Sequence, residues 1–135
     1  MRIYVLGSNH FMNEMVEVKN KLCDLGLDGW VHPHYEALVR GDDDEYLNRW
    51  RNGERAAIKR EHNTLHEHYK NILTSDGVLF VNGVKNGVEH YIGGNVLIEM
   101  GQAYVHNKKI FFLYGMPTGL SYQDEVDAMD PICLH

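Results

Sequence analysis

Glu99 is the acidic side chain of this sequence with the clearest capacity for chemistry. If Gly93–Ala103 forms a helix, residues three and four positions apart share a face, which places Glu99 with Asn95, Val96 and Ala103. That face is mostly apolar, and burying an unpaired carboxylate there is energetically costly. The sequence therefore predicts that a partner, a ligand or a pocket lies against Glu99.

A carboxylate in such a position can attack a sugar carbon. The attack forms a covalent glycosyl intermediate, which water or a second acceptor then resolves. The alternative is that Glu99 pairs with a lysine or arginine, as buried charges commonly do. Asp76, which directly precedes an apolar run, has two interpretations: a functional acid, or a cap that closes a turn by accepting hydrogen bonds from nearby amides.

The glycine pair Gly93 and Gly94 precedes the Glu99 helix and would let a ligand approach the backbone. The first amides of a helix are free donors and carry a partial positive charge. The pair belongs neither to a G-x-G-x-x-G dinucleotide motif nor to a Walker loop. Tight packing at the start of the helix is an equally good explanation for these glycines.

Short apolar runs alternate with helical patterns along the chain. The pattern predicts strands over residues 3–6, 27–31, 77–81, 110–114 and 132–134, and helices over residues 12–25, 46–50, 55–73, 93–106 and 123–129. Continuous apolar strands are covered on both faces, which indicates parallel pairing between two layers of helices. We therefore predict an α/β fold in one domain, residues 1–135: a three-layer α/β/α sandwich with a five-stranded parallel sheet.

Ligands of such sheets bind beyond the carboxyl ends of the strands. Three polar or glycine-bearing loops are predicted to meet at that edge: those after residues 6 and 81, and the loop before the Glu99 helix. His62 is predicted to lie near these loops because it faces the sheet in the predicted helix 55–73. The predicted substrate-binding residues are therefore Gly7, Ser8, Asn9, Asn82, Gly93, Gly94, Asn95 and His62.

Histidines cluster in two segments. His62, His66 and His68 include a pair one helical turn apart, but neither an H-E-x-x-H motif nor a nearby cysteine accompanies them. We therefore predict packed or surface histidines and no metal site. His32 and His34 follow the weak second strand, where they could contact a nucleobase or belong to a plain loop.

Charged residues concentrate between positions 42 and 60. The acidic run at 42–45 is interpreted as the start of a helix, because it lacks the glycine and distal glutamate of a calcium-binding EF-hand loop. The basic residues that follow could bind a 5'-phosphate of a substrate or simply solvate a helix. They are Arg49, Arg51, Arg55, Lys59 and Arg60.

Composition narrows the possible partners and compartment. A net charge of -6 argues against a nucleic-acid polymer, whose phosphates require clustered lysines and arginines. No stretch approaches the roughly 20 apolar residues of a membrane span, and the first apolar run is too short for a signal peptide. Cys23 and Cys133 show no metal-type spacing and are predicted to be reduced and buried. The predicted location is the cytoplasm, without membrane contact.

Three segments resemble the nucleoside 2-deoxyribosyltransferase family. They are Thr74–Val81, Gly93–Ala103 and Lys108–Leu113, and the order of strands and helices agrees over the remainder of the chain. The resemblance implies a flavodoxin-like sheet, a nucleoside or nucleotide ligand at its carboxyl edge, a homo-oligomer, and no metal or organic cofactor. It also implies that Glu99 is the nucleophile and Asp76 a site acid, and that Gly7 and Ser8 form part of the wall.

The resemblance leaves the reaction open between transfer of a deoxyribosyl group and its hydrolysis. Relatives often carry an acidic residue just before the glutamate helix, where this chain has Tyr91–Asn95; Asn95 or Glu89 could substitute. The predicted function is cleavage or transfer at the N-glycosidic bond of a 2'-deoxynucleoside or its 5'-monophosphate. The alternatives are a non-catalytic nucleotide-binding module and an NAD-type glycohydrolase.

Overall fold

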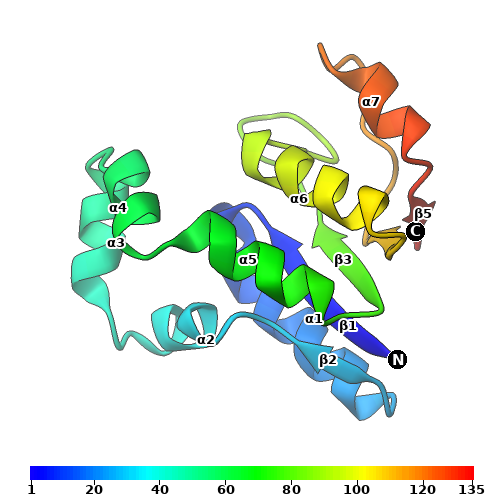
Figure 1. Ribbon diagram of the computed structural model, residues 1–135. Helices are drawn as coiled ribbons and strands as arrows, with labels where there is room; N and C mark the ends of the chain where they lie inside the picture. Colours follow the sequence, from blue (N-terminus) through cyan, green and yellow to red (C-terminus); the bar gives the residue numbers. More distant parts are fainter.

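The computed structural model describes residues 1–135 and contains five strands, seven α-helices and one short 3-10 helix, η1 (Asn9–Phe11) (Figure 1). The strands are β1 (Arg2–Gly7), β2 (Asp28–Trp30), β3 (Gly77–Val81), β4 (Lys109–Phe112) and β5 (Ile132–Cys133). The helices are α1 (Met12–Asp24), α2 (Pro33–Arg40), α3 (Asp44–Arg51), α4 (Arg55–Glu61), α5 (Thr64–Leu73), α6 (Gly94–Val105) and α7 (Gln123–Ala128).

All five strands are parallel and run in the order β2-β1-β3-β4-β5. Side chains alternate between the two faces, so Val5 and Leu79 pack under α1 and α2, whereas Tyr4 and Phe80 pack under α5, α6 and α7. Every residue of β3 is buried. The predicted three-layer α/β/α sandwich with a five-stranded parallel sheet is confirmed, and its strand order is that of flavodoxin-like folds.

The strand order creates a switch point between β1 and β3. The chain leaves β1 into α1, which covers one face of the sheet, and leaves β3 into α6, which covers the other. The two connections therefore separate at the carboxyl edge and leave a crevice there, the usual ligand position in open parallel sheets.

The helix predicted over residues 55–73 is in fact two helices, α4 and α5. The break falls at Asn63, whose φ of 52° lies in the left-handed region that ends a right-handed helix. Asparagine tolerates this conformation better than most residues do. The apolar period continues across the break, which is why periodicity alone indicated one helix.

Helix α2, which the sequence analysis treated as a loop, begins at Pro33 in the first helical position. The His32 side chain accepts a hydrogen bond from the His34 amide (3.1 Å), and Gly41 ends the helix with a φ of 81°. A proline at the first position and a glycine just past the end are a recognised start and stop signal. The signal was therefore present, but the eight-residue helix is too short for a strong apolar period.

The cysteines correct a second prediction. Both thiols are free, but Cys23 is exposed and Cys133 is half-buried, so the predicted burial is wrong. Cys23 lies in the last turn of α1, where its Sγ donates to the Gly29 carbonyl at 3.2 Å.

None of the helices has both the length and the apolar character that crossing a membrane requires.

Candidate functional site

Glu99 lies on the inner face of α6, as the helical period predicted. The residue is only 5% exposed, and its Oε2 atom is buried without a hydrogen-bond partner. No ion pair includes its carboxyl group. Burial raises the pKa of Glu99 to about 8, while the positive charge of Lys59 acts in the opposite direction. Glu99 is therefore a buried, unpaired carboxyl group.

Two tyrosines share the electrostatic environment of Glu99. Burial is the main cause that raises the pKa of Tyr4 and of Tyr35, and the negative charge of Glu99 raises both further. Tyr4 comes from β1 and Tyr35 from α2, so the charge of Glu99 acts on side chains of two other elements. Tyr35 also lines the pocket described next, whereas Glu99 is not among its lining residues.

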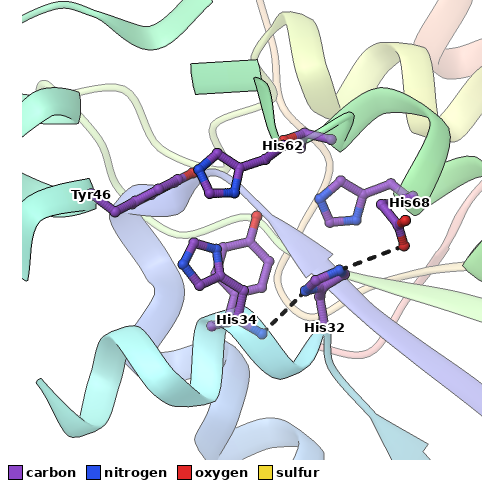
Figure 2. A pocket seen from close by; sticks show the side chains of 8 residues that line it. His32, His34, Tyr46, His62 and His68 are labelled. Carbon is purple, nitrogen blue, oxygen red and sulfur yellow. Dashed lines mark hydrogen bonds and ion pairs between the residues drawn. The ribbon is translucent and has the colours of Figure 1, made fainter. Parts of the chain in front are cut away.

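A pocket of about 340 Å³ lies beyond the carboxyl ends of β1 and β2 (Figure 2). Helix α2 and the segment before it supply one side, the start of α5 the other, and α3 together with the end of α4 the outer part. The lining residues are His32, His34, Tyr35, Tyr46, His62, Thr64, Glu67 and His68. The lining side chains are mostly polar, and six of the eight carry an aromatic ring. Such a lining suits a planar ligand with hydrogen-bonding edges.

Three rings form the outer wall of this pocket. His34 and His62 stack with centroids 5.5 Å apart and an interplanar angle of 12°, and Tyr46 meets both edge-on (Figure 2). The Nε2 atom of His34 lies 3.0 Å from Asp43 Oδ2. Asp43 also accepts from the Tyr46 amide at 3.2 Å, so a single carboxylate ties the start of α3 to α2.

His68 forms the buried wall and is held by a chain of hydrogen bonds. Asn71 Nδ2 donates to the Tyr4 hydroxyl oxygen (3.4 Å), and the hydroxyl lies 2.5 Å from His68 Nδ1. Since the Asn71 amide donates, we assign the Tyr4 hydroxyl as donor to Nδ1, which leaves the proton on Nε2. Burial lowers the pKa of His68 to about 4. His68 is thus a neutral hydrogen-bond donor at neutral pH.

The loops after β1 and β3 meet the loop before α6, as predicted. Lys85 Nζ donates to Ser8 Oγ at 3.2 Å, and the Tyr91 amide donates to the Gly83 carbonyl at 2.9 Å. Asn9 Oδ1 accepts from the Tyr35 hydroxyl at 2.8 Å, which connects the same loop to the pocket. Ser8 and Asn9 therefore lie between the pocket and the start of α6.

Gly93, Gly94 and Asn95 form the bare start of α6. Gly93 is the N-cap and supplies no capping side chain, and a Cβ on it would lie 3.0 Å from the Tyr91 ring. A Cβ on Gly94 would meet nothing within 4 Å, so open space adjoins that residue. Asn95 Oδ1 accepts from Lys59 Nζ at 3.0 Å. The helix therefore begins at an open position, Gly94, whereas Gly93 packs against the Tyr91 ring.

Two predicted binding residues have structural roles instead. A Cβ on Gly7 would lie 3.0 Å from the Val81 carbonyl, so this glycine permits close packing of β1 on β3. The fully buried Asn82 side chain donates to the Gly115 carbonyl (2.9 Å) and accepts from the Tyr114 amide (3.0 Å). Because the nitrogen and the oxygen of the Asn82 side-chain amide both bind the chain after β4, neither atom is free for a substrate.

Asp76 is not brought to the site. It directly precedes β3 and therefore lies at the amino edge of the sheet, opposite the pocket. Its side chain is exposed and accepts a hydrogen bond from the Arg2 amide at 2.7 Å, which is the capping interpretation of the sequence. The expected role as site acid is corrected accordingly. A residue before a parallel strand always faces that edge, so the signal was available in the sequence.

The histidines divide between the pocket and the surface. His62 lines the pocket as predicted, but from the end of α4 and not from within a long helix. His66 points elsewhere, with Nδ1 2.8 Å from Asn63 Oδ1. No group of three or more histidine, cysteine or acidic side chains is arranged to hold a metal ion.

The basic residues also divide. Arg49 forms a two-pronged pair with Glu61 (2.7 and 2.9 Å) and contacts Glu54, while the Arg55 guanidinium lies 4.4 Å from the centre of the Trp50 ring. These contacts hold α3 and α4 together. Within the predicted basic group, Lys59 is the residue that hydrogen-bonds to α6.

Among the eight lining residues, His62 was a predicted binding residue and His32 and His34 were possible base contacts, whereas Tyr35, Tyr46, Thr64, Glu67 and His68 were not predicted. For His68 a signal existed, because it lies four residues before Ile72 and therefore shares the inner face of its helix. Tyr46 and Thr64 come from α3 and the start of α5, and only the fold brings them together. No local pattern could have indicated their proximity.

Fold and site together define a flavodoxin-like α/β protein with a polar pocket at the carboxyl edge of its sheet and a buried carboxyl group on α6. Comparisons of the chain with protein-family models, curated proteins and solved structures gave no match.

Proposed function

We propose that this protein is an enzyme that cleaves or transfers at the N-glycosidic bond of a 2'-deoxynucleoside or its 5'-monophosphate, with Glu99 as nucleophile. The observation that carries the proposal is the buried Glu99 carboxyl group, which has an unpartnered oxygen and whose charge acts on Tyr35, a residue of the pocket at the ligand-binding edge of the sheet. The resemblance of Gly93–Ala103 to the glutamate helix of the nucleoside 2-deoxyribosyltransferases supports the same role.

The pocket suits the base and the region around Glu99 suits the sugar. Rings of His34, Tyr46 and His62 offer contact to a planar base, and His68 offers a fixed donor to one of its acceptor atoms. The anomeric carbon would then lie toward α6. The reaction needs no metal or organic cofactor, because the nucleophile and the proton donors are side chains.

The protonation state of Glu99 sets a condition on the mechanism. With a pKa of about 8, the carboxyl group is mostly neutral at pH 7, and only its anion can attack the anomeric carbon. The departing base leaves with the electron pair of the broken C–N bond and takes its proton from His32 or Glu67, whose Nε2 and Oε2 atoms lie 3.9 Å apart at the pocket. Because burial lowers the pKa of His32, and the reaction needs an ionised Glu99 together with a protonated acid, we expect kcat/KM to pass through a maximum below pH 8.

The test is release of free base from deoxynucleosides and their 5'-monophosphates, followed by chromatography. Base release should fall at least a hundredfold in Glu99→Gln, on the order expected for loss of a nucleophile. Asp76→Asn is the matched control, since Asp76 lies at the opposite edge of the sheet and should leave base release unchanged. Equal base release by wild type and Glu99→Gln would refute the mechanism.

Two further arms of the assay resolve the reaction class. A second free base in the mixture should yield a new nucleoside if the enzyme is a transferase, and free sugar or sugar phosphate if it is a hydrolase. The intact mass of the protein, measured after rapid quenching, should increase by one deoxyribosyl group in wild type but not in Glu99→Gln. Release of nicotinamide from NAD would instead indicate a glycohydrolase of dinucleotides.

A non-catalytic nucleotide-binding module is the second candidate, and one observation favours it. The segment Tyr91–Asn95 before α6 has no acidic residue, and Asp76 is too remote to replace one. Such a module would be stabilised in a thermal-shift assay by nucleotides that it leaves intact.

We also propose that the chain assembles with copies of itself, as the resemblance implies. Exposed apolar side chains on the outer faces of α5 and α6 support this: Leu65, Leu73, Ile98 and Val105 are between 38% and 69% exposed. Light scattering coupled to size exclusion should give a mass above 15.6 kDa. A charged substitution, Ile98→Glu, should lower that mass if α6 forms the contact.

A further inference from the structure

Two lysines from different parts of the chain converge on the bare start of α6. Lys59 comes from α4, and its Nζ lies 3.0 Å from Asn95 Oδ1 in the first turn of α6. Lys85 comes from the loop after β3, and its Nζ lies 3.2 Å from Ser8 Oγ and 4.9 Å from the centre of the Tyr91 ring. That ring packs against Gly93, the N-cap.

Neither lysine has a negatively charged partner. Their hydrogen-bond partners are a neutral amide and a neutral hydroxyl, and no ion pair in the structure includes either side chain. Burial lowers the pKa of Lys85, and the positive charges of Arg55 and Lys59 lower it further. Arg55, Lys59 and Lys85 thus lie within range of one another, and the acidic residue that acts on Lys59 is Glu99, which burial keeps mostly neutral; a bound anion would relieve the repulsion.

The helix terminus adds donors to the same place. The first amides of a helix have no partner within the helix, and α6 has twelve residues and no capping side chain. Gly94 is exposed and open space adjoins its Cα, so this end of the helix is open to solvent. The site also lies at the switch point of the sheet, because Ser8 follows β1 and Lys85 follows β3.

Glu99 connects this region to the proposed reaction. It lies five residues beyond Gly94, about 7.5 Å along the helix axis, and Lys59 is the cation that acts on its carboxyl group. A ligand with an anionic end at Gly94 can therefore extend toward the unpartnered oxygen of Glu99. A nucleotide has this arrangement, with the sugar between its phosphate and its base.

We propose that Lys59, Lys85 and the first amides of α6 bind the 5'-phosphate of the substrate, so that the protein selects a nucleotide over the corresponding nucleoside. This inference rests on the proposed function for the identity of the ligand, but phosphate binding can be tested without turnover. A lysine pair and a helix terminus suit a phosphate because each contributes charge-assisted hydrogen bonds.

The direct test is a titration of the full-length protein with inorganic phosphate, followed by the amide resonances of residues 93–96 in two-dimensional NMR. Matched titrations with chloride at equal ionic strength remove the effect of salt. Phosphate should shift these amides at saturable concentrations, and its dissociation constant should increase about tenfold or more in Lys59→Gln and in Lys85→Gln. Lys109→Gln, at the amino edge of β4, should bind phosphate like wild type.

The phosphate site would be overturned if amides 93–96 showed no saturable shift, or if wild type and both lysine variants bound phosphate with equal affinity. It would also be overturned if Lys109→Gln lost as much phosphate affinity as the two lysine variants, because net charge alone would then explain the loss. Circular dichroism of each variant verifies folding, and Lys85→Arg should recover part of the affinity if charge at that position matters. A variant that fails to fold is replaced by the corresponding Lys→Met, which keeps the aliphatic stem.

The substrate arm separates this inference from the proposed function. The ratio of kcat/KM for a deoxynucleoside 5'-monophosphate to that for the deoxynucleoside should be large and should fall at least tenfold in Lys85→Gln, through KM. Base release with equal efficiency from both substrates would refute the phosphate site and keep the function. Phosphate binding without base release from any substrate would refute the function and keep the phosphate site.

Discussion

At the scale of single residues, two buried titratable groups define the site. Glu99 and His68 lie on neighbouring helices, α6 and α5, and burial shifts both toward their neutral forms. Burial acts oppositely on the two pKa values, because it disfavours an anion in one case and a cation in the other. His68 therefore presents a neutral base to the pocket, and Glu99 is a neutral acid buried on α6.

The raised pKa of Glu99 predicts that Glu99→Gln stabilises the protein, increasingly as the pH rises. Between pH 4.5 and 8 the unfolded state releases a proton that the folded state keeps, so the free energy of unfolding of wild type falls across this window. Above it, the difference between the variant and wild type should reach roughly 3–5 kcal/mol. Urea denaturation at pH 4.5 and at pH 8.5 measures this, and a constant difference would contradict the burial argument.

The Tyr4–His68 hydrogen bond predicts one imidazole tautomer. Nitrogen chemical shifts of His68 at pH 7 should show a proton on Nε2 and none on Nδ1, and His68 should remain neutral down to about pH 4. In Tyr4→Phe, which keeps the ring but removes the hydroxyl donor, the tautomer preference should weaken. Titration of His68 near its ordinary pKa of 6.5 would show that the ring is not buried as described.

At the scale of elements, the outer wall of the pocket is a helical pair, α3 and α4, that lies to one side of the sheet (Figure 1). Helix α3 packs on α4, and the Arg49–Glu61 contacts join them. The pair is positioned by Asn63, whose left-handed conformation turns the chain from α4 into α5. The break thereby places His62 at the pocket.

Asn63 can be tested with a matched pair of variants. Both Asn63→Ala and Asn63→Gly lose the contact with His66, but only alanine is strained at a φ of 52°. We expect Asn63→Ala to be less stable than Asn63→Gly by about 1 kcal/mol in urea denaturation. Equal stability of the two would mean that the left-handed turn is not required.

At the scale of the whole molecule, the parallel sheet gathers the site at one edge and leaves the other edge to structural contacts. Nucleotide binding should therefore stabilise the entire fold, by about 2.7 kcal/mol when the ligand is at 100 times its dissociation constant. In a thermal-shift assay, a deoxynucleoside 5'-monophosphate should raise Tm in the inactive Glu99→Gln and in Asp76→Asn. A rise in Tm that survives in the double variant Lys59→Gln/Lys85→Gln would place the ligand elsewhere.

The layers of the fold and the burial of Glu99 followed from local patterns in the chain. Apolar runs and helical periods are local features, so they predicted the parallel sheet and the face of α6 on which Glu99 lies. The spacing of apolar residues did not predict the turn at Asn63, because that spacing does not depend on the backbone angle of a single residue.

The surroundings of Glu99, by contrast, depend on how separate elements pack together. The pocket joins α2, α3, the end of α4 and α5, and Lys59 and Lys85 reach the start of α6 from separate segments. The packing also assigned the nitrogen and the oxygen of the Asn82 side chain to the segment after β4. The physical reason is that spacing along a chain fixes neighbours within one element, whereas contacts between elements depend on how the sheet and its helices pack.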